Sequence, residues 1–124
     1  VAEDLLMHEL SIAVGLIEQV EALLDENQAA LATRVCVRIG SLSGVEPEAL
    51  RMAFPVAAED GRVAADALEI ECVPAKARCG ACGRSYEPAF PFLACEHCGD
   101  ADVEVLEGRD MTLISVEMKG STED

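Results

Sequence analysis

The stretch TRVCVRIG, residues 33–40, alternates strictly between polar and apolar side chains. Its apolar members are Val35, Val37 and Ile39, and each is separated from the next by an arginine or a cysteine. Such alternation is the pattern of a strand with one face in a hydrophobic core and the other in solvent. We therefore predict a half-buried strand here, which needs a layer of other elements against its apolar face.

A helix is predicted before this strand, over residues 8–28. Acidic side chains, Glu9 among them, fall mostly on its opposite face, and Asn27 with the alanines after it predicts a fraying end. The large apolar side chains recur at helical spacing and form one stripe. The members of this stripe are Leu10, Val14, Ile17, Val20 and Leu24.

A second helix is predicted after the strand, opened by SLSGVEPEALRMAF at residues 41–54. Ser43 and Glu46 have the spacing of a capping box, and Pro47 suits a first helical turn, whose amides lack partners within the helix. Leu50, Phe54 and Ala57 continue its buried stripe until Asp60–Gly61 ends the helix.

Two further strands complete the pattern, since residues 67–73 and 111–118 alternate again. The resulting order is helix, strand, helix, strand, insertion, strand. This predicts an α+β fold of two helices packed on a small three-stranded sheet, with an inserted zinc-ribbon-like subdomain. The predicted domains are residues 1–73 plus 110–124 and, between them, the insertion at 74–109.

Two cysteine pairs dominate the insertion, CGACG at residues 79–83 and CEHCG at 95–99. Two residues between cysteines let one tight turn present both sulfurs to a single ion. We therefore predict a structural zinc site formed by Cys79, Cys82, Cys95 and Cys98. Zinc contributes about 10–16 kcal/mol in zinc-finger peptides, which is enough to order a short segment.

Other interpretations of the cysteines are weaker. Two disulfides require an oxidising compartment, and rubredoxin-type iron normally has a larger aromatic cage. His97, inside the second pair, is an alternative ligand to one thiolate or simply points to solvent. Cys36 and Cys72 stand alone on separate strands, so we expect them to be small buried hydrophobes rather than ligands.

Charge narrows the class of partner, because the chain carries 24 acidic and 9 basic residues, a formal net charge of -15. Such a protein repels nucleic-acid phosphates and anionic membranes, and it suits metal cations or basic patches on partner proteins. The first basic residue is Arg34, which argues against a targeting segment, and no apolar run is long enough to span a membrane. We expect a cytoplasmic protein that binds neither nucleic acid nor membrane.

Several motifs together resemble one family: MHELSIAVGLIEQV, VCVRIGSLSGVEPEALRMAF, the two cysteine pairs and the closing MTLISVEMKG. From Met7 to about Gly120 the chain is similar to HypA/HybF, the nickel metallochaperones of [NiFe]-hydrogenase maturation. The resemblance implies a nickel domain of two helices and three strands, with a zinc domain inserted before the last strand. It also implies a carrier, not an enzyme, that delivers Ni(II) to the hydrogenase large subunit together with the GTPase HypB. Some relatives serve urease, which adds urease maturation proteins to the candidate partners.

The resemblance also implies a nickel site at Met7, His8 and Glu9, with Glu46 as a further acidic residue. A free amine on Met7, the amide nitrogen of His8 and its imidazole would form two fused chelate rings, which suits square-planar Ni(II). The residues VAEDLL precede Met7 here, and we expect Met7 to be the native start. Without the resemblance, His8 is an exposed histidine near a helix start, Glu9 a first-turn acid and Glu46 a cap.

The main competing hypothesis is a zinc-ribbon adaptor that mediates protein interactions without nickel transfer. An enzyme is less favoured, because no nucleophile–base pair and no open metal position is visible in the sequence.

Overall fold

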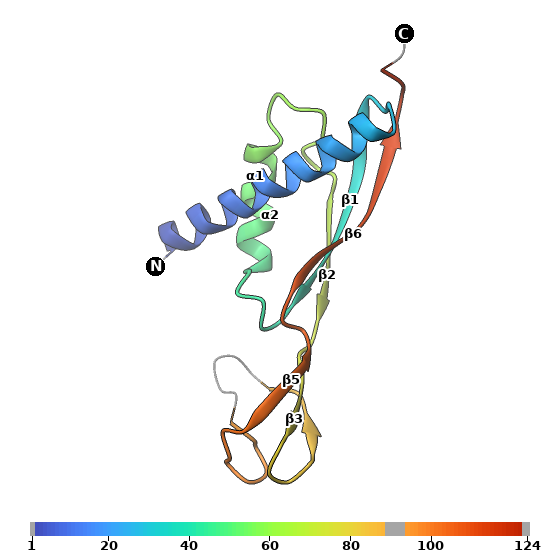
Figure 1. Cartoon of the computed structure of the whole chain (residues 1–124). Coiled ribbons are helices and arrows are strands. Elements are labelled where there is room, and N and C mark those ends of the chain that lie inside the picture. Colours follow the sequence, from blue (N-terminus) through green and yellow to red (C-terminus); the bar gives the residue numbers. More distant parts are fainter. Residues whose placement is uncertain (1, 89–93, 123–124) are drawn as a thin grey trace. The chain divides into compact units, whose positions relative to one another are not determined.

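The computed structural model describes residues 2–88 and 94–122, with side chains from His8 onward (Figure 1). Its helices are α1 (Ala2–Glu26) and α2 (Pro47–Ala57). Its strands are β1 (Leu31–Gly40), β2 (Leu68–Val73), β3 (Lys76–Cys79), β4 (Ser85–Tyr86), β5 (Val103–Glu107) and β6 (Met111–Lys119). The predicted order of helices and strands is confirmed. Within the described residues, no helix is long and apolar enough to cross a membrane.

The chain folds into two compact units. The first consists of Val1–Val37, Glu46–Glu71 and Leu113–Asp124. The second consists of Arg38–Val45 and Cys72–Thr112. The second unit therefore holds the cysteine-containing segment together with the turn that follows β1. The predicted domain boundaries at residues 73/74 and 109/110 concern independent folding, and they stay a prediction.

The first unit confirms the predicted α+β class. Its sheet has the strand order β2-β1-β6, which places the alternating stretch of the sequence on the central strand. β1 and β2 run in the same direction, β6 runs in the opposite one, and both helices lie on one face of the sheet (Figure 1). The α2 connection thus serves as the crossover that two parallel strands require.

The core of this unit lies between the helices and β1, where Val35 and Val37 are fully buried, as the alternation predicts. Phe54 is the largest fully buried side chain. Burying a side chain of this kind contributes about 1.5–3 kcal/mol. The large helical members of the core are Leu16, Ile17, Val20, Leu24, Leu50 and Phe54.

The predicted stripe on α1 is wrong at two positions. Val14 is 43% exposed, and its neighbour Ala13 takes the buried place instead. Glu9, predicted on the solvent face, is completely buried. Both errors have one physical reason: the buried face includes a small residue and a carboxylate, which a pattern of large apolar residues cannot reveal.

The end of α1 is ordered, so the predicted fraying is wrong. The amides of Gln28 and Ala29 donate to the carbonyls of Asp25 (3.2 Å) and Leu24 (2.9 Å). Gln28 has a φ of 54°, in the left-handed region, and Ala29 is buried. These contacts form a Schellman motif, which usually has glycine where this chain has Gln28.

The cap of α2 is Glu46, and the predicted capping box with Ser43 is not formed. The Glu46 carboxylate accepts from the amide of Glu48 at 3.1 Å, and Pro47 occupies the first turn as predicted. Ser43 instead accepts from the amide of Val45 at 3.2 Å, which closes a local turn before the helix. A hydroxyl that is used in its own turn cannot reach the helix amides.

The second unit is built on a small sheet of strand order β4-β3-β5. β3 pairs antiparallel with both neighbours, so that Ala77 lies opposite Tyr86 on one side and Val105 on the other. Close backbone contact joins the turn after β1 to the end of β5. A Cβ at Gly40 would lie 2.2 Å from the carbonyl carbon of Gly108, so this crossing requires glycine.

Candidate metal centres

Both cysteine pairs form the same turn. In each, the amide of the first cysteine donates to the carbonyl five residues later, at 3.0 Å for Cys79 and 2.9 Å for Cys95. The glycine after the second cysteine donates back to the first cysteine's carbonyl, at 2.9 and 2.8 Å. These glycines, Gly83 and Gly99, have φ angles of 77° and 78°, where glycine is favoured. Two copies of one turn thus present four sulfurs toward a common point.

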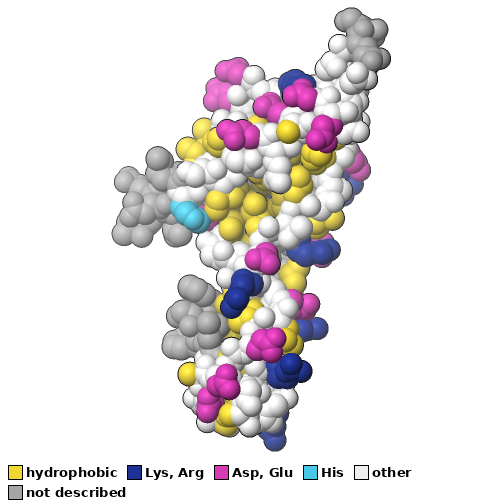
Figure 2. Space-filling view, viewed as in Figure 1, with side chains coloured by type: hydrophobic (Ala, Val, Ile, Leu, Met, Phe, Trp, Pro, Cys, Tyr) yellow, Lys and Arg dark blue, Asp and Glu magenta, His cyan; other side chains and the backbone are white. Residues whose placement is uncertain are grey.

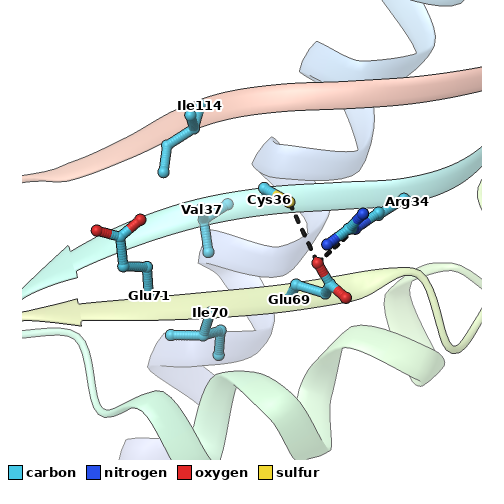
Figure 3. A pocket seen from close by; sticks show the side chains of 7 residues that line it. All are labelled: Arg34, Cys36, Val37, Glu69, Ile70, Glu71 and Ile114. Carbon is cyan, nitrogen blue, oxygen red and sulfur yellow. Dashed lines mark hydrogen bonds and ion pairs between the residues drawn. The ribbon is translucent and has the colours of Figure 1, made fainter.

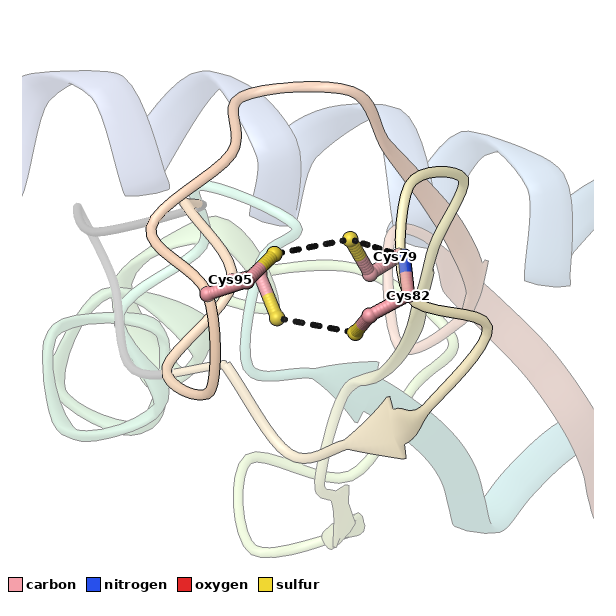
Figure 4. A group of neighbouring side chains, drawn as sticks. Cys79, Cys82 and Cys95 are labelled. Carbon is pink, nitrogen blue, oxygen red and sulfur yellow. Dashed lines mark hydrogen bonds between the residues drawn. The ribbon is translucent and has the colours of Figure 1, made fainter.

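The four sulfurs form a compact cluster, in which all ligand atoms lie within 4.8 Å of one another (Figure 4). The Sγ atoms of Cys79 and Cys98 are 3.6 Å apart, and those of Cys82 and Cys95 are 3.7 Å apart. A tetrahedron with zinc–sulfur bonds of about 2.3 Å has edges of about 3.8 Å. The cluster therefore has the size that a tetrathiolate zinc site requires.

Hydrogen bonds and charge also favour a cation among these sulfurs. The amide of His97 donates to the Sγ of Cys95 at 3.4 Å. Although burial opposes ionisation, the amides of Cys98 and His97 lower the pKa of Cys95 to about 7. The Asp100 amide favours the Cys98 thiolate, but contact with the Cys79 sulfur and lost hydration raise the pKa of Cys98 to about 12. Four adjacent thiolates need a bound cation to coexist.

The cysteine cluster lies at a hydrophobic core of few residues. Cys79 and Cys95 are buried together with Ala77 and Tyr86. Burial is the main cause of a raised pKa at the Tyr86 phenol, and the nearby sulfurs raise this pKa further. The ring of His97 lies outside this core, with its Nδ1 at 3.3 Å from Nη1 of Arg84. In this arrangement His97 faces a guanidinium rather than the metal position.

The lone cysteines differ from the prediction that both are buried. Cys72 is exposed, and Cys36 is only partly buried. Cys36 lies on the open face of the first unit's sheet, where its thiol contacts the Oε2 of Glu69 at 3.4 Å, beside Arg34 (Figure 3). Alternation had placed Cys36 on the polar side of β1, and that signal was the better guide than the usual burial of cysteine.

Three of the four predicted nickel residues form one hydrogen-bonded cluster at the first unit's helices. Nδ1 of His8 lies 2.6 Å from Oε1 of Glu9. The other Glu9 oxygen, Oε2, accepts from the backbone amide of Glu46 at 2.6 Å. The Glu46 carboxylate in turn caps α2. Residues 37 positions apart in sequence thus meet through one carboxylate.

The fourth predicted residue, Met7, has its backbone in α1, and its side chain lies outside the described residues. The His8 side chain is 59% exposed, whereas Glu9 is 0% exposed. A solvent-accessible imidazole therefore sits on a fully buried acid. This contrast could not be read from the pattern, which placed both residues on the surface.

Basic side chains form no cluster on the face shown in Figure 2, where they alternate with acidic ones. Ion pairs with carboxylates are formed by several of the chain's basic residues, among them Arg34, Arg51, Arg62, Lys76 and Arg78. Such exposed pairs contribute little to stability.

The fold and the cysteine cluster together define an α+β metal-binding protein with a four-cysteine ribbon. Residues 7–118 match the family described as "Hydrogenase/urease nickel incorporation, metallochaperone, hypA". The chain belongs to this HypA family, a family of nickel metallochaperones and hydrogenase maturation factors.

Individual relatives agree with this assignment. A hydrogenase maturation factor HypA of Nitrosospira multiformis is 43% identical over 112 residues, which cover 90% of this chain and 97% of the relative. One from Chlorobium limicola is 37% identical over 110 residues, or 89% and 95% of the two chains. The solution structure of the Ni metallochaperone HypA from Helicobacter pylori superposes with a TM-score of 0.64 at 31% identity, covering 91% of this chain and 98% of that one.

Proposed function

We propose that this protein carries Ni(II) to the large subunit of [NiFe]-hydrogenase and acts without catalysing a reaction. The observation that carries the proposal is the cluster of His8, Glu9 and Glu46, which the fold brings together from the second turn of α1 and the cap of α2. An exposed imidazole next to acidic groups offers the nitrogen and oxygen ligands that Ni(II) accepts. Membership of the HypA family supports nickel as the cargo.

The nickel ligands in this proposal are nitrogen atoms of Met7 and His8, with Glu9 and Glu46 as the acidic residues of the site. When Met7 carries a free amine, that amine, the His8 amide and the imidazole can surround one ion in a plane. Such a site is open to solvent on the side of the 59% exposed His8 ring. An open site suits an ion that has to be handed on.

Zinc has a separate, structural role in the proposal. Cys79, Cys82, Cys95 and Cys98 would hold it, and the bound ion would supply the folding energy that the second unit's small core lacks. All four positions of a tetrahedral site are then filled by protein, which leaves no position for a substrate. The domain at residues 74–109 is proposed to order only around this ion.

The proposed partners are the GTPase HypB and the hydrogenase large subunit, in the cytoplasm. With a net charge of -15, the surface suits docking to basic regions on these proteins. Binding to HypB should therefore weaken as salt is raised. A urease maturation protein is the alternative client, and a pull-down with purified hydrogenase and urease components separates the two.

A nickel titration of the zinc-loaded protein tests the central claim. Calorimetry should show one nickel site in protein that begins at Met7, and His8→Ala should remove it. His97→Ala is the matched control, because His97 is the other of the two histidines and lies beside the cysteine cluster. Loss of nickel binding in the His97 variant alone would contradict the assignment.

One observation favours a zinc-ribbon adaptor that transfers no nickel. In the chain that begins at Val1, Met7 follows Leu6 within α1, so its nitrogen is an amide, and Nδ1 of His8 is already held by Glu9. An adaptor would bind zinc and a partner protein but show no nickel heat in either form of the chain.

A further inference from the structure

The buried carboxylate of Glu9 has both oxygens in use. Oε1 faces Nδ1 of His8 at 2.6 Å, and Oε2 accepts from the Glu46 amide at 2.6 Å. A carboxylate with no exposed surface depends on such partners, because an unpaired buried charge is costly. Within the described residues, no buried side-chain nitrogen or oxygen lacks a hydrogen-bond partner.

This arrangement determines where the imidazole carries its proton. An ionised carboxylate can only accept, so Nδ1 of His8 must be the donor. In the neutral ring the lone pair then lies on Nε2. Glu9 is buried and the His8 side chain is 59% exposed. The ring therefore has Nδ1 toward the protein and its other side toward solvent.

We propose that, in the chain whose Met7 nitrogen is an amide, Glu9 is a positioning residue: its buried carboxylate holds Nδ1 of His8 so that Nε2 is the nitrogen offered to nickel. The inference rests on the proposed nickel site at His8 and adds which nitrogen is used and what selects it. Metal-binding histidines commonly donate their other ring N–H to a carboxylate, which fixes the tautomer and the orientation of the ring. Glu9 meets this description without being a ligand itself.

The consequence is a choice between two binding modes. A chelate ring that includes the His8 amide nitrogen closes through Nδ1 with six members, and Nε2 is too far around the ring to close it. The fused amine–amide–imidazole chelate therefore requires the His8–Glu9 contact to break. Glu9 would then lose one of the two hydrogen-bond partners that it has among the described residues, so without a free amine at Met7 the carboxylate favours the Nε2 mode.

Glu9→Gln is the decisive variant because it keeps the size of the side chain but replaces one carboxylate oxygen, a hydrogen-bond acceptor, with an NH2 group, a donor. The side-chain oxygen of the introduced glutamine has to face the Glu46 amide, which leaves its NH2 group toward Nδ1 of His8 and favours the tautomer protonated on Nε2. Glu21→Gln is the matched control, since Glu21 lies on the same helix and accepts from a backbone amide, that of Arg62 at 3.0 Å, with no histidine involved.

Long-range proton–nitrogen NMR spectra report the tautomers directly, and the chain has only two histidines. At a pH where the ring is neutral, His8 should be protonated on Nδ1 in wild type and in the Glu21 variant. It should be protonated on Nε2 in Glu9→Gln, while His97 stays unchanged. The same His8 tautomer in wild type and Glu9→Gln would overturn the proposal.

Nickel titration of the chain that begins at Val1 adds the second measurement. Glu9→Gln should weaken nickel binding about 10–100-fold, the usual effect of losing such a partner, and Glu21→Gln should not. Equal affinity in all three proteins would overturn the selection of Nε2. If none of the three proteins bound nickel but the tautomers changed as expected, the use of Nε2 for nickel would be overturned and the contact of Glu9 with His8 would stand. The proposed function fails separately, if protein that begins at Met7 binds no nickel.

Discussion

The cysteine cluster and the His8 cluster are built in opposite ways. The cysteine cluster takes four identical ligands from two copies of one turn, and its sulfurs lie at tetrahedral spacing without further change. The His8 cluster joins three residues, two from the second turn of α1 and one from the cap of α2, and its members are hydrogen-bonded to one another. The four sulfurs can surround one ion by themselves, whereas in our proposal the His8 cluster offers a metal one free ring nitrogen and needs further ligands from elsewhere.

In our proposal, the cysteine cluster suits an ion that stays in the protein, and the His8 cluster suits an ion that is passed on. A closed shell of four thiolates leaves no coordination position for a further ligand, which is typical of a structural ion. A partly exposed imidazole on a buried acid presents one nitrogen and leaves the remaining positions to the N-terminus, solvent or a partner. The contrast predicts that perturbing the first site changes the fold, while perturbing the second changes binding.

The largest expected effect is loss of zinc. Cys79→Ser, or a strong chelator, should unfold the second unit, because zinc contributes on the order of 10 kcal/mol in comparable small sites. NMR should show collapse of the amide signals of β3–β5 while those of α1 and α2 persist. Cys72→Ser is the matched control, an exposed cysteine outside the cluster, and should retain zinc and fold. A metal-free protein with an ordered ribbon would remove the distinction between the two sites.

The next effect concerns the N-terminus. Protein that begins at Met7 should bind nickel more than about tenfold, or 1.4 kcal/mol, more tightly than protein that begins at Val1. The gain from two chelate rings has to exceed the loss of the His8–Glu9 contact. Calorimetry on both forms measures the difference, with zinc content as the control. Equal affinities would show that the hold of Glu9 prevails and that the amine plays no part.

A smaller effect is expected from the cap of α2. Glu46→Ala removes the acceptor for the Glu48 amide and should lower the free energy of unfolding of the first unit by about 0.5–2 kcal/mol. Glu46→Asn should restore most of it, because asparagine is a good N-cap. Denaturant titration followed by helical circular dichroism checks this. Loss of zinc in either variant would mean that the two sites are less separate than proposed.

The smallest expected effect is an increase in stability. Gln28 occupies the left-handed position after α1, so Gln28→Gly should raise the free energy of unfolding by about 1 kcal/mol. Nickel and zinc binding should not change, since Gln28 contacts neither cluster. Gln19→Gly, in the middle of the same helix, is the opposite control and should destabilise by about 1 kcal/mol. A stabilised variant with altered nickel affinity would link the far end of α1 to the His8 site.

Sequence patterns predicted the architecture well because they report on regular contacts. Alternation found the central strand, and the spacing of the cysteines found all four members of the cluster. Prediction failed where a residue acted against its usual type: a small Ala13 in the core, a left-handed Gln28, an exposed Cys72. In each case the contacts that decide the outcome come from elsewhere in the chain or from a single backbone angle.

The proposed nickel residues show the same limit of sequence-based prediction more clearly. Similarity to a family named Met7, His8, Glu9 and Glu46, but it gave them one shared role. Tertiary structure separated them, because only the packing of α1 beside the start of α2 buries Glu9 and supplies the Glu46 amide as its second partner.

What the sequence by itself determined is therefore whatever depends on local spacing. A period of two makes a strand, a two-residue gap makes a cysteine turn that holds a metal, and 24 acids against 9 bases make an acidic surface. What only the tertiary structure decided is the environment of each group. Burial and partners determine whether a carboxylate is a surface charge, a ligand or a holder of another ligand, and here a contact across 37 positions made Glu9 the last of these in our proposal.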